Sequence, residues 1–158
     1  NTAVGLEFDA VRSEVLSQKR NIDQLRTEIL EMRRKVHAGH PNPSGDFDLK
    51  HDSGGMVDIE FMVQFLVLAY SSQHQKLIGN LGNIALLRIA GEVGLIDPGV
   101  ALSVGNAYRL FRSRQHRLRL DGAEKTRINL ENESELIAAR ETVLALWLEI
   151  FHAPSDSE

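Results

Sequence analysis

The stretch Phe47-Asp-Leu-Lys-His-Asp-Ser-Gly-Gly-Met-Val-Asp-Ile-Glu-Phe-Met-Val-Gln64 decides the fold, because a polar loop passes here into an apolar helix. Residues 50–55 are polar and contain a glycine pair, which predicts a loop. From Met56 the chain is apolar on nearly every side, a pattern typical of a buried helix. We expect this helix to run to about His74.

Three polar side chains interrupt the apolar helix. Asp58 lies in the first turn, where the helix dipole and the free amides favour a carboxylate. Glu60 and Gln64 are one turn apart and share a face. Polar groups on a buried helix are costly unless they find partners, so these residues have either a structural or a functional reason to be there.

The loop before the helix allows two interpretations. Gly54 and Gly55 let the backbone turn, and with Lys50 upstream and Asp58 downstream they form a candidate anion site. In the structural alternative the glycines make only the turn, Asp58 caps the helix, and the polar residues beyond it bond buried neighbours. The residues alone leave both interpretations open.

Length and composition predict one globular domain over residues 1–158. The net charge of −4 argues against a dedicated nucleic-acid-binding domain, but it is compatible with a local basic patch. The chain has no cysteine, which fits a reducing cytoplasm, and its longest apolar run is too short to span a bilayer. The first residue is Asn1 rather than methionine, so we expect an excised piece of a longer protein.

Hydrophobic periodicity predicts an all-α fold, a bundle of about six helices. Besides the buried helix, the expected helices cover residues 6–18, 21–38, 84–92, 98–120 and 132–151. A loop over residues 39–55 and a frayed tail over residues 153–158 complete the prediction.

Three of these helices carry recognisable start signals. Capping boxes are predicted for Asn21 with Gln24 and for Asn132 with Glu135, and Asp97 followed by proline marks the start of the 98–120 helix.

The apolar stripe of the 21–38 helix is expected to include Met32, and the opposite face, with Arg33, is expected to be solvated.

Acidic and histidine clusters near the loop suggest a metal only weakly. Asp46 and Asp48 are alternate carboxylates, but no flanking strands support a metal pair, so a turn-forming, solvated pair is the preferred interpretation. His37, His40 and His51 match no known ligand spacing and are interpreted as ordinary surface histidines. No metal site is predicted.

Basic side chains form a stripe on the 98–120 helix. Arg109, Arg112, His116 and Arg119 are spaced three, four and three residues apart, which places them on one face. Such a stripe could bind phosphates or an acidic partner surface. A solvated or internally paired face is the more common alternative.

The loop and helix start resemble a known family. Asp48-Leu49-Lys50, Gly54-Gly55, Asp58-Ile59-Glu60-Phe61 and Gln64 match the Asp-Ile-Lys…Gly-Gly-x-x-Asp-Ile-Glu-Phe-x-x-Gln signature of the bifunctional glutamine synthetase adenylyltransferase. Weaker matches lie before the loop at residues 32–35 and after it, in the expected order, at residues 83–87, 107–112 and 116–120, so the resemblance covers about residues 20–150. A helical domain of the PII uridylyltransferase is similar as well.

This resemblance implies the helical domain that follows a nucleotidyltransferase domain, and Trp147 with the short tail suggests the C-terminal half. The parent enzyme would move AMP from ATP onto a tyrosine of glutamine synthetase and remove it again, under control of PII protein and glutamine. Magnesium and ATP would belong to the catalytic domain. Its Gly-Ser…Asp-x-Asp strand motif is missing here, so the piece is expected to be inactive alone and to bind no cofactor.

Three hypotheses follow from the resemblance. In the first, Lys50 offers a charge to nucleotide phosphates or to the catalytic domain, the glycine pair lets amides approach closely, and Asp58, Glu60 and Gln64 belong to that interface. In the second, the arginine stripe docks glutamine synthetase, PII or a polyanion. In the third, the bundle only positions the catalytic domain.

Overall fold

The computed structural model describes residues 21–155, and the fold there is all-α, as predicted. The predicted helix at residues 6–18 lies outside this range. The elements are α2 (Ile22–Gly39), β1 (Phe47–Asp48), α3 (Met56–Tyr70), the 3-10 helix η1 (Gln75–Ile78), α4 (Asn83–Glu92), α5 (Pro98–Leu120), β2 (Arg127–Ile128) and α6 (Ser134–Phe151). Within the described residues no helix is long and apolar enough to cross a membrane.

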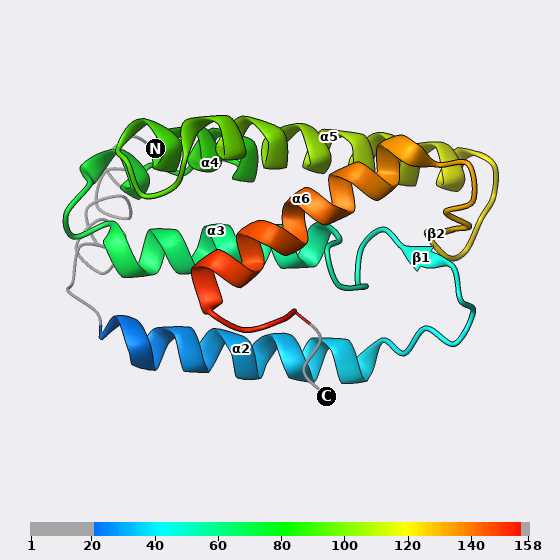
Figure 1. The fold of residues 1–158 in the computed structure, drawn as a ribbon, viewed down its shortest axis with the longest axis horizontal. Helices are drawn as coiled ribbons and strands as arrows, with labels where there is room; N and C mark the ends of the chain where they lie inside the picture. The colour runs from blue at the N-terminus through cyan, green and yellow to red at the C-terminus, as the bar shows by residue number, and fades with distance from the viewer. Residues whose placement is uncertain (1–20, 156–158) are drawn as a thin grey trace, which may run out of the picture.

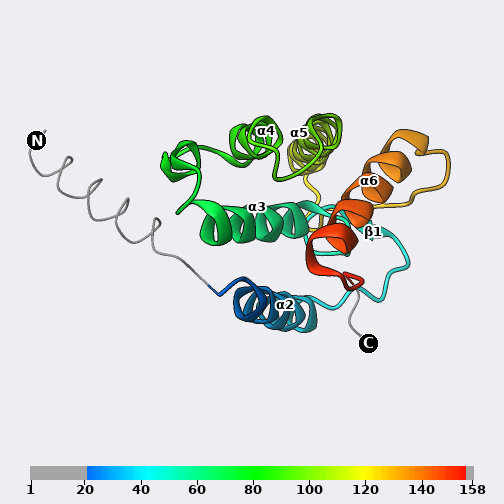
Figure 2. The same cartoon turned by 60° about the vertical axis from the view of Figure 1, so that its left-hand side comes forward.

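Helix α3 is the centre of the bundle. It packs against α2 on one side and against α4 and α5 on the other, and α6 crosses it (Figures 1 and 2). Ile59 and Met62 are fully buried, and Trp147 and Phe151 of α6 join the same core. The prediction of a buried helix is confirmed, because an apolar surface on every side needs neighbours on every side.

Two predicted helix starts are confirmed by their caps. The Asn21 side chain accepts a hydrogen bond from the Gln24 amide at 3.0 Å, although the Gln24 side chain turns to Glu28 and does not close the box. The Asp97 side chain accepts from two amides of the first turn of α5. Each bond satisfies a helix N–H that has no partner within the helix.

Two predicted boundaries are wrong. Helix α3 ends at Tyr70, and the chain turns before η1 begins after His74. The predicted capping box at Asn132 does not form, because Asn132 has a φ of 64° and belongs to a turn. Helix α6 begins two residues later, at Ser134. Asparagine tolerates the left-handed conformation, which is why a good capping residue can equally end a turn.

A short antiparallel strand pair fastens the 39–55 loop to the connection between α5 and α6. Phe47 pairs with Ile128 and Asp48 with Arg127. The next residue, Leu49, continues the contact by donating its amide to the Thr126 carbonyl at 2.8 Å. The loop is therefore held to the bundle at its middle as well as at its ends.

The chain after α6 turns back along α2 (Figure 1). His152 ends α6 in the left-handed conformation, and Ser155 is buried. This differs from the frayed tail expected over 153–158, of which the structure describes only residues 153–155. Arg26 of α2 donates to the Ile150 carbonyl at 2.9 Å, so α2 is tied to α6 as well as to α3.

Candidate functional site

The buried carboxylate of Asp58 organises the loop before α3. It is fully buried and accepts hydrogen bonds from the Arg33 guanidinium, the Ser155 hydroxyl and the Gly54 amide, the last at 2.8 Å. Arg33, only 2% exposed, also donates to the His51 carbonyl at 3.1 Å. One ion pair thus holds the loop at two points, His51 and Gly54.

Opposing influences act on the ionisation of Asp58. The pKa of the Asp58 carboxyl is raised on balance, because burial outweighs the lowering by the charge of Arg33 and by the hydrogen bonds from Ser155, Gly54 and Arg33. A carboxylate in a core stays charged only while such partners compensate for the lost water. The three donors are therefore part of what keeps the loop in place.

The glycine pair serves close packing. Gly54 has a φ of +84°, and a Cβ there would lie 2.7 Å from Cγ of Arg140 on α6. A Cβ on Gly55 would lie 2.7 Å from the Leu49 carbonyl oxygen. The Gly54 amide donates to Asp58, the Gly55 amide to the Asp52 carbonyl, and both residues are buried. Their amides already have partners within the chain, which favours the structural interpretation of this pair.

A second carboxylate shapes the start of the loop. Asp48 accepts hydrogen bonds from the Lys50 and His51 amides at 2.9 and 3.0 Å, so the turn-forming interpretation is confirmed. The expectation that it is solvated is wrong, because strand pairing leaves Asp48 only 6% exposed, 3.8 Å from Nε of Arg127. No group of three or more possible metal ligands comes together in the described part of the chain.

The predicted surface histidines are not all independent. His40 and His51 stack with ring centroids 3.7 Å apart, whereas His37 is exposed at the end of α2. Burial, and then the neighbouring His40, lower the pKa of His51. The stack joins the end of α2 to the loop, and it makes His51 a half-buried packing residue.

The predicted interface residues on the outer side of the loop are accessible. Lys50 and Gln64 are exposed, and Glu60 is half-buried between them in sequence. Gln64 is therefore not the buried polar residue that the helix pattern suggested. Burial raises the pKa of Glu60, and the charge of Lys50 partly offsets this. Lys50 and Glu60 thus interact electrostatically on the surface of the bundle.

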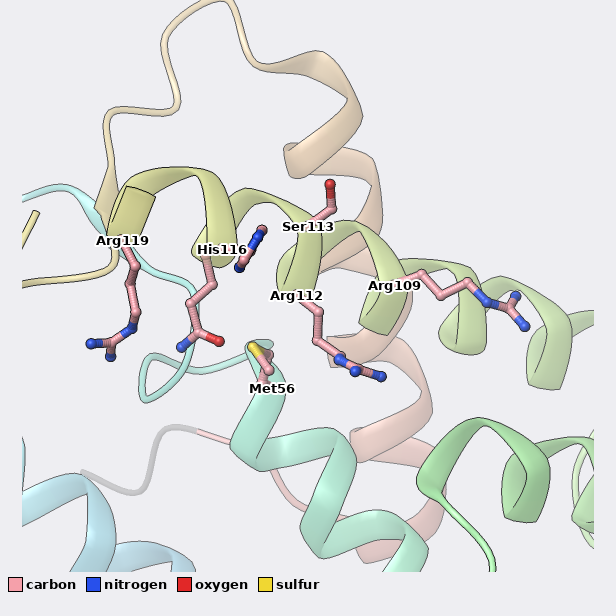
Figure 3. A pocket seen from close by; sticks show the side chains of 7 residues that line it. Met56, Arg109, Arg112, Ser113, His116 and Arg119 are labelled. Atoms are coloured by element: carbon pink, nitrogen blue, oxygen red, sulfur yellow. The ribbon is translucent and has the colours of Figure 1, made fainter. Parts of the chain in front are cut away.

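The arginine stripe of α5 lines a pocket of about 480 Å³. Its wall contains all four predicted residues, Arg109, Arg112, His116 and Arg119, and Met56 at the start of α3 lies opposite. Figure 3 shows the side chains of Arg112 and Arg119 extending on either side of Met56, while Arg109 points away along α5. The pocket therefore joins the stripe to the end of the 50–55 loop.

The stripe is positioned but not neutralised. The Arg112 guanidinium lies over the Tyr108 ring, 5.8 Å from its centroid, and Arg109 donates to Asn106 at 3.0 Å. In the described residues none of the three stripe arginines forms an ion pair, whereas Arg114 on the same helix binds Glu133 through two hydrogen bonds. The internally paired interpretation thus applies to Arg114 and not to the stripe.

The structure brings together two sets of residues that are far apart in sequence. Met56 connects them, and Glu60, one turn further along α3, acts electrostatically on Tyr108 of α5. Lys50, Glu60 and the stripe are accordingly parts of one region, here called the α3–α5 face.

Two residues that bind the buried Asp58 carboxylate, Arg33 and Ser155, were not identified from the sequence. Arg33 was assigned to a solvated face, but it lies four residues after Ile29 and eight after Leu25, on the buried side of α2. Met32, assigned to the apolar stripe, is 45% exposed. The spacing from Leu25 and Ile29 was an available signal. For Ser155 no local signal existed, because its partner is 97 positions away.

Comparison with known proteins places this region in context. The sequence model of the family described as GlnD PII-uridylyltransferase matches residues 17–143, a span that includes the 50–55 loop, α3 and the stripe.

Curated relatives share the name bifunctional glutamine synthetase adenylyltransferase/adenylyl-removing enzyme. The protein of Bordetella bronchiseptica is 50% identical over 147 residues, which cover 93% of this chain. That of Burkholderia mallei is 52% identical over 151 residues (95%), and that of Ralstonia nicotianae 53% over 148 residues (94%). The chain spans only 15–16% of the length of these relatives.

Proposed function

The chain belongs to the GlnD PII-uridylyltransferase family, and from this premise we propose that it is a helical domain working beside a nucleotidyltransferase catalytic domain. The relatives at 50–53% identity are named as adenylyltransferases of glutamine synthetase, so we assign the chain to an enzyme of that kind. Its reaction would transfer AMP from ATP to a tyrosine of glutamine synthetase. The uridylyltransferase of PII is the alternative parent, supported by the description of the family model.

One observation carries the proposal: Met56, the residue that directly follows the 50–55 loop, lines the pocket of the arginine stripe at the α3–α5 face. Lys50, Gln64 and the stripe are exposed there, and the stripe arginines form no ion pair within the described residues. Exposed guanidinium groups without an internal partner are free to bind phosphate or carboxylate groups of another domain or ligand. We take this face as the surface toward the catalytic domain and its nucleotide.

The buried residues of the signature act indirectly. Asp58, Gly54 and Gly55 are enclosed by Arg33, Arg140 and the loop itself, so they position Lys50 instead of touching a ligand. In this proposal the catalytic domain holds the magnesium and the ATP that react. The regulatory contacts with PII and glutamine are made by the whole enzyme. A cytoplasmic location is part of the same proposal, since the chain has no cysteine.

The test is Lys50→Ala in the full enzyme that contains this chain. Transfer of labelled AMP from ATP to glutamine synthetase should fall at least about tenfold, since a positioned charge near transferring phosphates contributes this much or more. Lys35→Ala, which removes an exposed lysine from α2, is the matched control and should keep full activity. Full activity of Lys50→Ala, with an unchanged melting temperature, would contradict the proposal.

The unpaired stripe favours one second candidate, a docking module for glutamine synthetase or PII. In that case Arg112→Glu with Arg119→Glu abolishes partner binding and leaves basal AMP transfer intact. Loss of basal transfer without loss of partner binding would instead favour the catalytic-domain face. A purely structural bundle predicts that neither the Lys50 nor the arginine variants change activity.

A further inference from the structure

The charge of α5 is strongly one-sided. Between residues 98 and 120 the chain has five arginines and no aspartate or glutamate, although the whole protein carries a net charge of −4. Glu133 neutralises Arg114, and Arg117 lies outside the pocket. The uncompensated charge therefore concentrates where Arg112 and Arg119 flank Met56 (Figure 3).

We propose that the pocket between Met56 and the stripe binds a compact anion with two or more phosphate groups. This inference rests on the proposed function, because it names the ligand class of the same face. Arg112 and Arg119 are seven residues apart, about 10 Å along the helix axis, and their side chains extend on either side of Met56 (Figure 3), so a single phosphate does not bridge the two guanidinium groups. A chain of phosphates can, and each guanidinium can donate two parallel hydrogen bonds to phosphate oxygens.

The size of the site fits a small ligand, although the site opens widely to solvent. A hollow of about 480 Å³ lies within the range of about 300–1,000 Å³ that is usual for small-molecule pockets. Arg112 is held over Tyr108 before any ligand arrives, which lowers the entropy cost of binding. Met56, only 7% exposed, contributes a small apolar surface to the otherwise polar pocket.

The carboxylate of Glu60 limits the direction in which a bound anion can extend from the pocket. It lies one turn beyond Met56 and acts on Tyr108, so a ligand that extended along α3 toward it would meet like charge. We therefore place the phosphates toward Arg112 and Arg119 and away from Glu60.

The test is isothermal titration calorimetry of the 158-residue chain at low ionic strength with inorganic tripolyphosphate, ATP and adenosine. We expect tripolyphosphate and ATP to bind, adenosine not to bind, and affinity to fall as salt is raised. Arg112→Ala and Arg119→Ala should each weaken binding about tenfold or more, because each removes a charge-assisted contact. Arg117→Ala removes the same charge from an exposed position on the same helix and should leave the affinity unchanged.

Comparing the affinities of these compounds distinguishes the possible classes of ligand. Tighter binding of ATP than of tripolyphosphate identifies a nucleotide polyphosphate as the ligand, and equal binding identifies the phosphate chain alone; both support the inference. Absence of binding by both phosphate compounds overturns it. Equal losses in Arg117→Ala and Arg112→Ala also overturn it, since they would show only a diffuse charge effect. Binding of a glutamate decapeptide without polyphosphate binding overturns it in favour of a protein partner.

The two proposals can fail separately. If tripolyphosphate and ATP do not bind but Lys50→Ala still abolishes AMP transfer in the full enzyme, the ligand class is wrong and the proposed function stands. If they bind as expected and Lys50→Ala keeps full activity, the pocket is real and the role assigned to the loop is wrong.

Discussion

At the scale of single residues, the fully buried Asp58 carboxylate accepts hydrogen bonds from three different parts of the chain. Asp58→Ala should cost about 3–5 kcal/mol of unfolding free energy, because it leaves the charge of Arg33 buried without a partner. Urea unfolding followed by circular dichroism measures this loss. The double variant Arg33→Met with Asp58→Leu should recover only part of it, since no unpaired charge remains but the Gly54 amide and the Ser155 hydroxyl lose their acceptor. A loss within about 0.5 kcal/mol, typical of a surface change, would contradict this role.

Gly54 can be tested against a glycine with the same backbone conformation. Gly54 and Gly45 have φ values of +84° and +79°, but a Cβ would meet Arg140 and Leu144 at Gly54 and nothing within 4 Å at Gly45. Gly45→Ala should cost only the left-handed strain, about 1–2 kcal/mol. Gly54→Ala should lose about 1–3 kcal/mol more, because Arg140 is held by its hydrogen bond to the Ser53 carbonyl.

The measurement for this pair is the difference between the two midpoints of chemical unfolding. Equal losses for Gly54→Ala and Gly45→Ala would show that α6 can move away from the loop, and the packing role of Gly54 would then be wrong.

The raised pKa of Glu60 predicts how the stability of the folded protein changes with pH. Burial raises the pKa of Glu60 above its ordinary value of 4.5, so the folded protein binds this proton more tightly than the unfolded chain does. Ionisation of Glu60 therefore lowers stability as pH rises from 4.5 through the folded-state pKa. Glu60→Gln should be more stable than the parent at neutral pH, and the difference should disappear below pH 4.5. Melting temperatures across this range test it, and a difference that grows toward acid pH would contradict it.

At the scale of elements, the segment 153–155 acts as a strap over α2. Among the helices α2 packs mainly on α3, and the strap adds the bond from Ser155 to the buried Asp58 carboxylate. Ser155→Ala should lower the free energy of local α2 opening by about 1–3 kcal/mol, the cost of removing a donor from a buried charged acceptor.

Hydrogen exchange measured by NMR reports this opening directly. Amides of α2 should exchange faster in Ser155→Ala, while those of α4 and α5 keep their protection. Ser103→Ala, at an exposed position of α5, is the control and should change neither. Uniform acceleration over all helices would mean that the strap stabilises the whole bundle rather than α2.

Element by element, prediction from sequence succeeded where the cause was local. The buried character of α3 and the caps at Asn21 and Asp97 follow from residues within one or two turns. Several of the failures have distant causes. The spacing within α2 places Arg33 on the buried side, but the partner that compensates its charge, Asp58, lies 25 positions away and cannot be identified from α2 alone.

At the scale of the whole molecule, the α3–α5 face shows the same division. Its members were found in advance as two separate groups, the loop signature and the stripe, because each is visible as a short pattern. The two groups lie near each other at Met56 because α5 packs over α3. The residue spacing within one helix does not indicate how two helices pack. The pairing of β1 with β2 was missed for the same reason, since two residues form no period.

The strand pair described above has a consequence for the order of folding. Asp48 and Thr126, which meet beside it, are 78 positions apart, so this contact pays a large loop-closure entropy, whereas α4 and α5 are neighbours along the chain. We expect the pair to form after the rate-limiting step: Phe47→Ala should speed unfolding in stopped-flow experiments and leave the refolding rate almost unchanged. A slower refolding rate would place the pair in the folding nucleus instead. If the strand pair forms late, the segment that contains Lys50 reaches its final conformation only after the helices have packed. Incompletely folded chains then do not expose Lys50 in its native conformation.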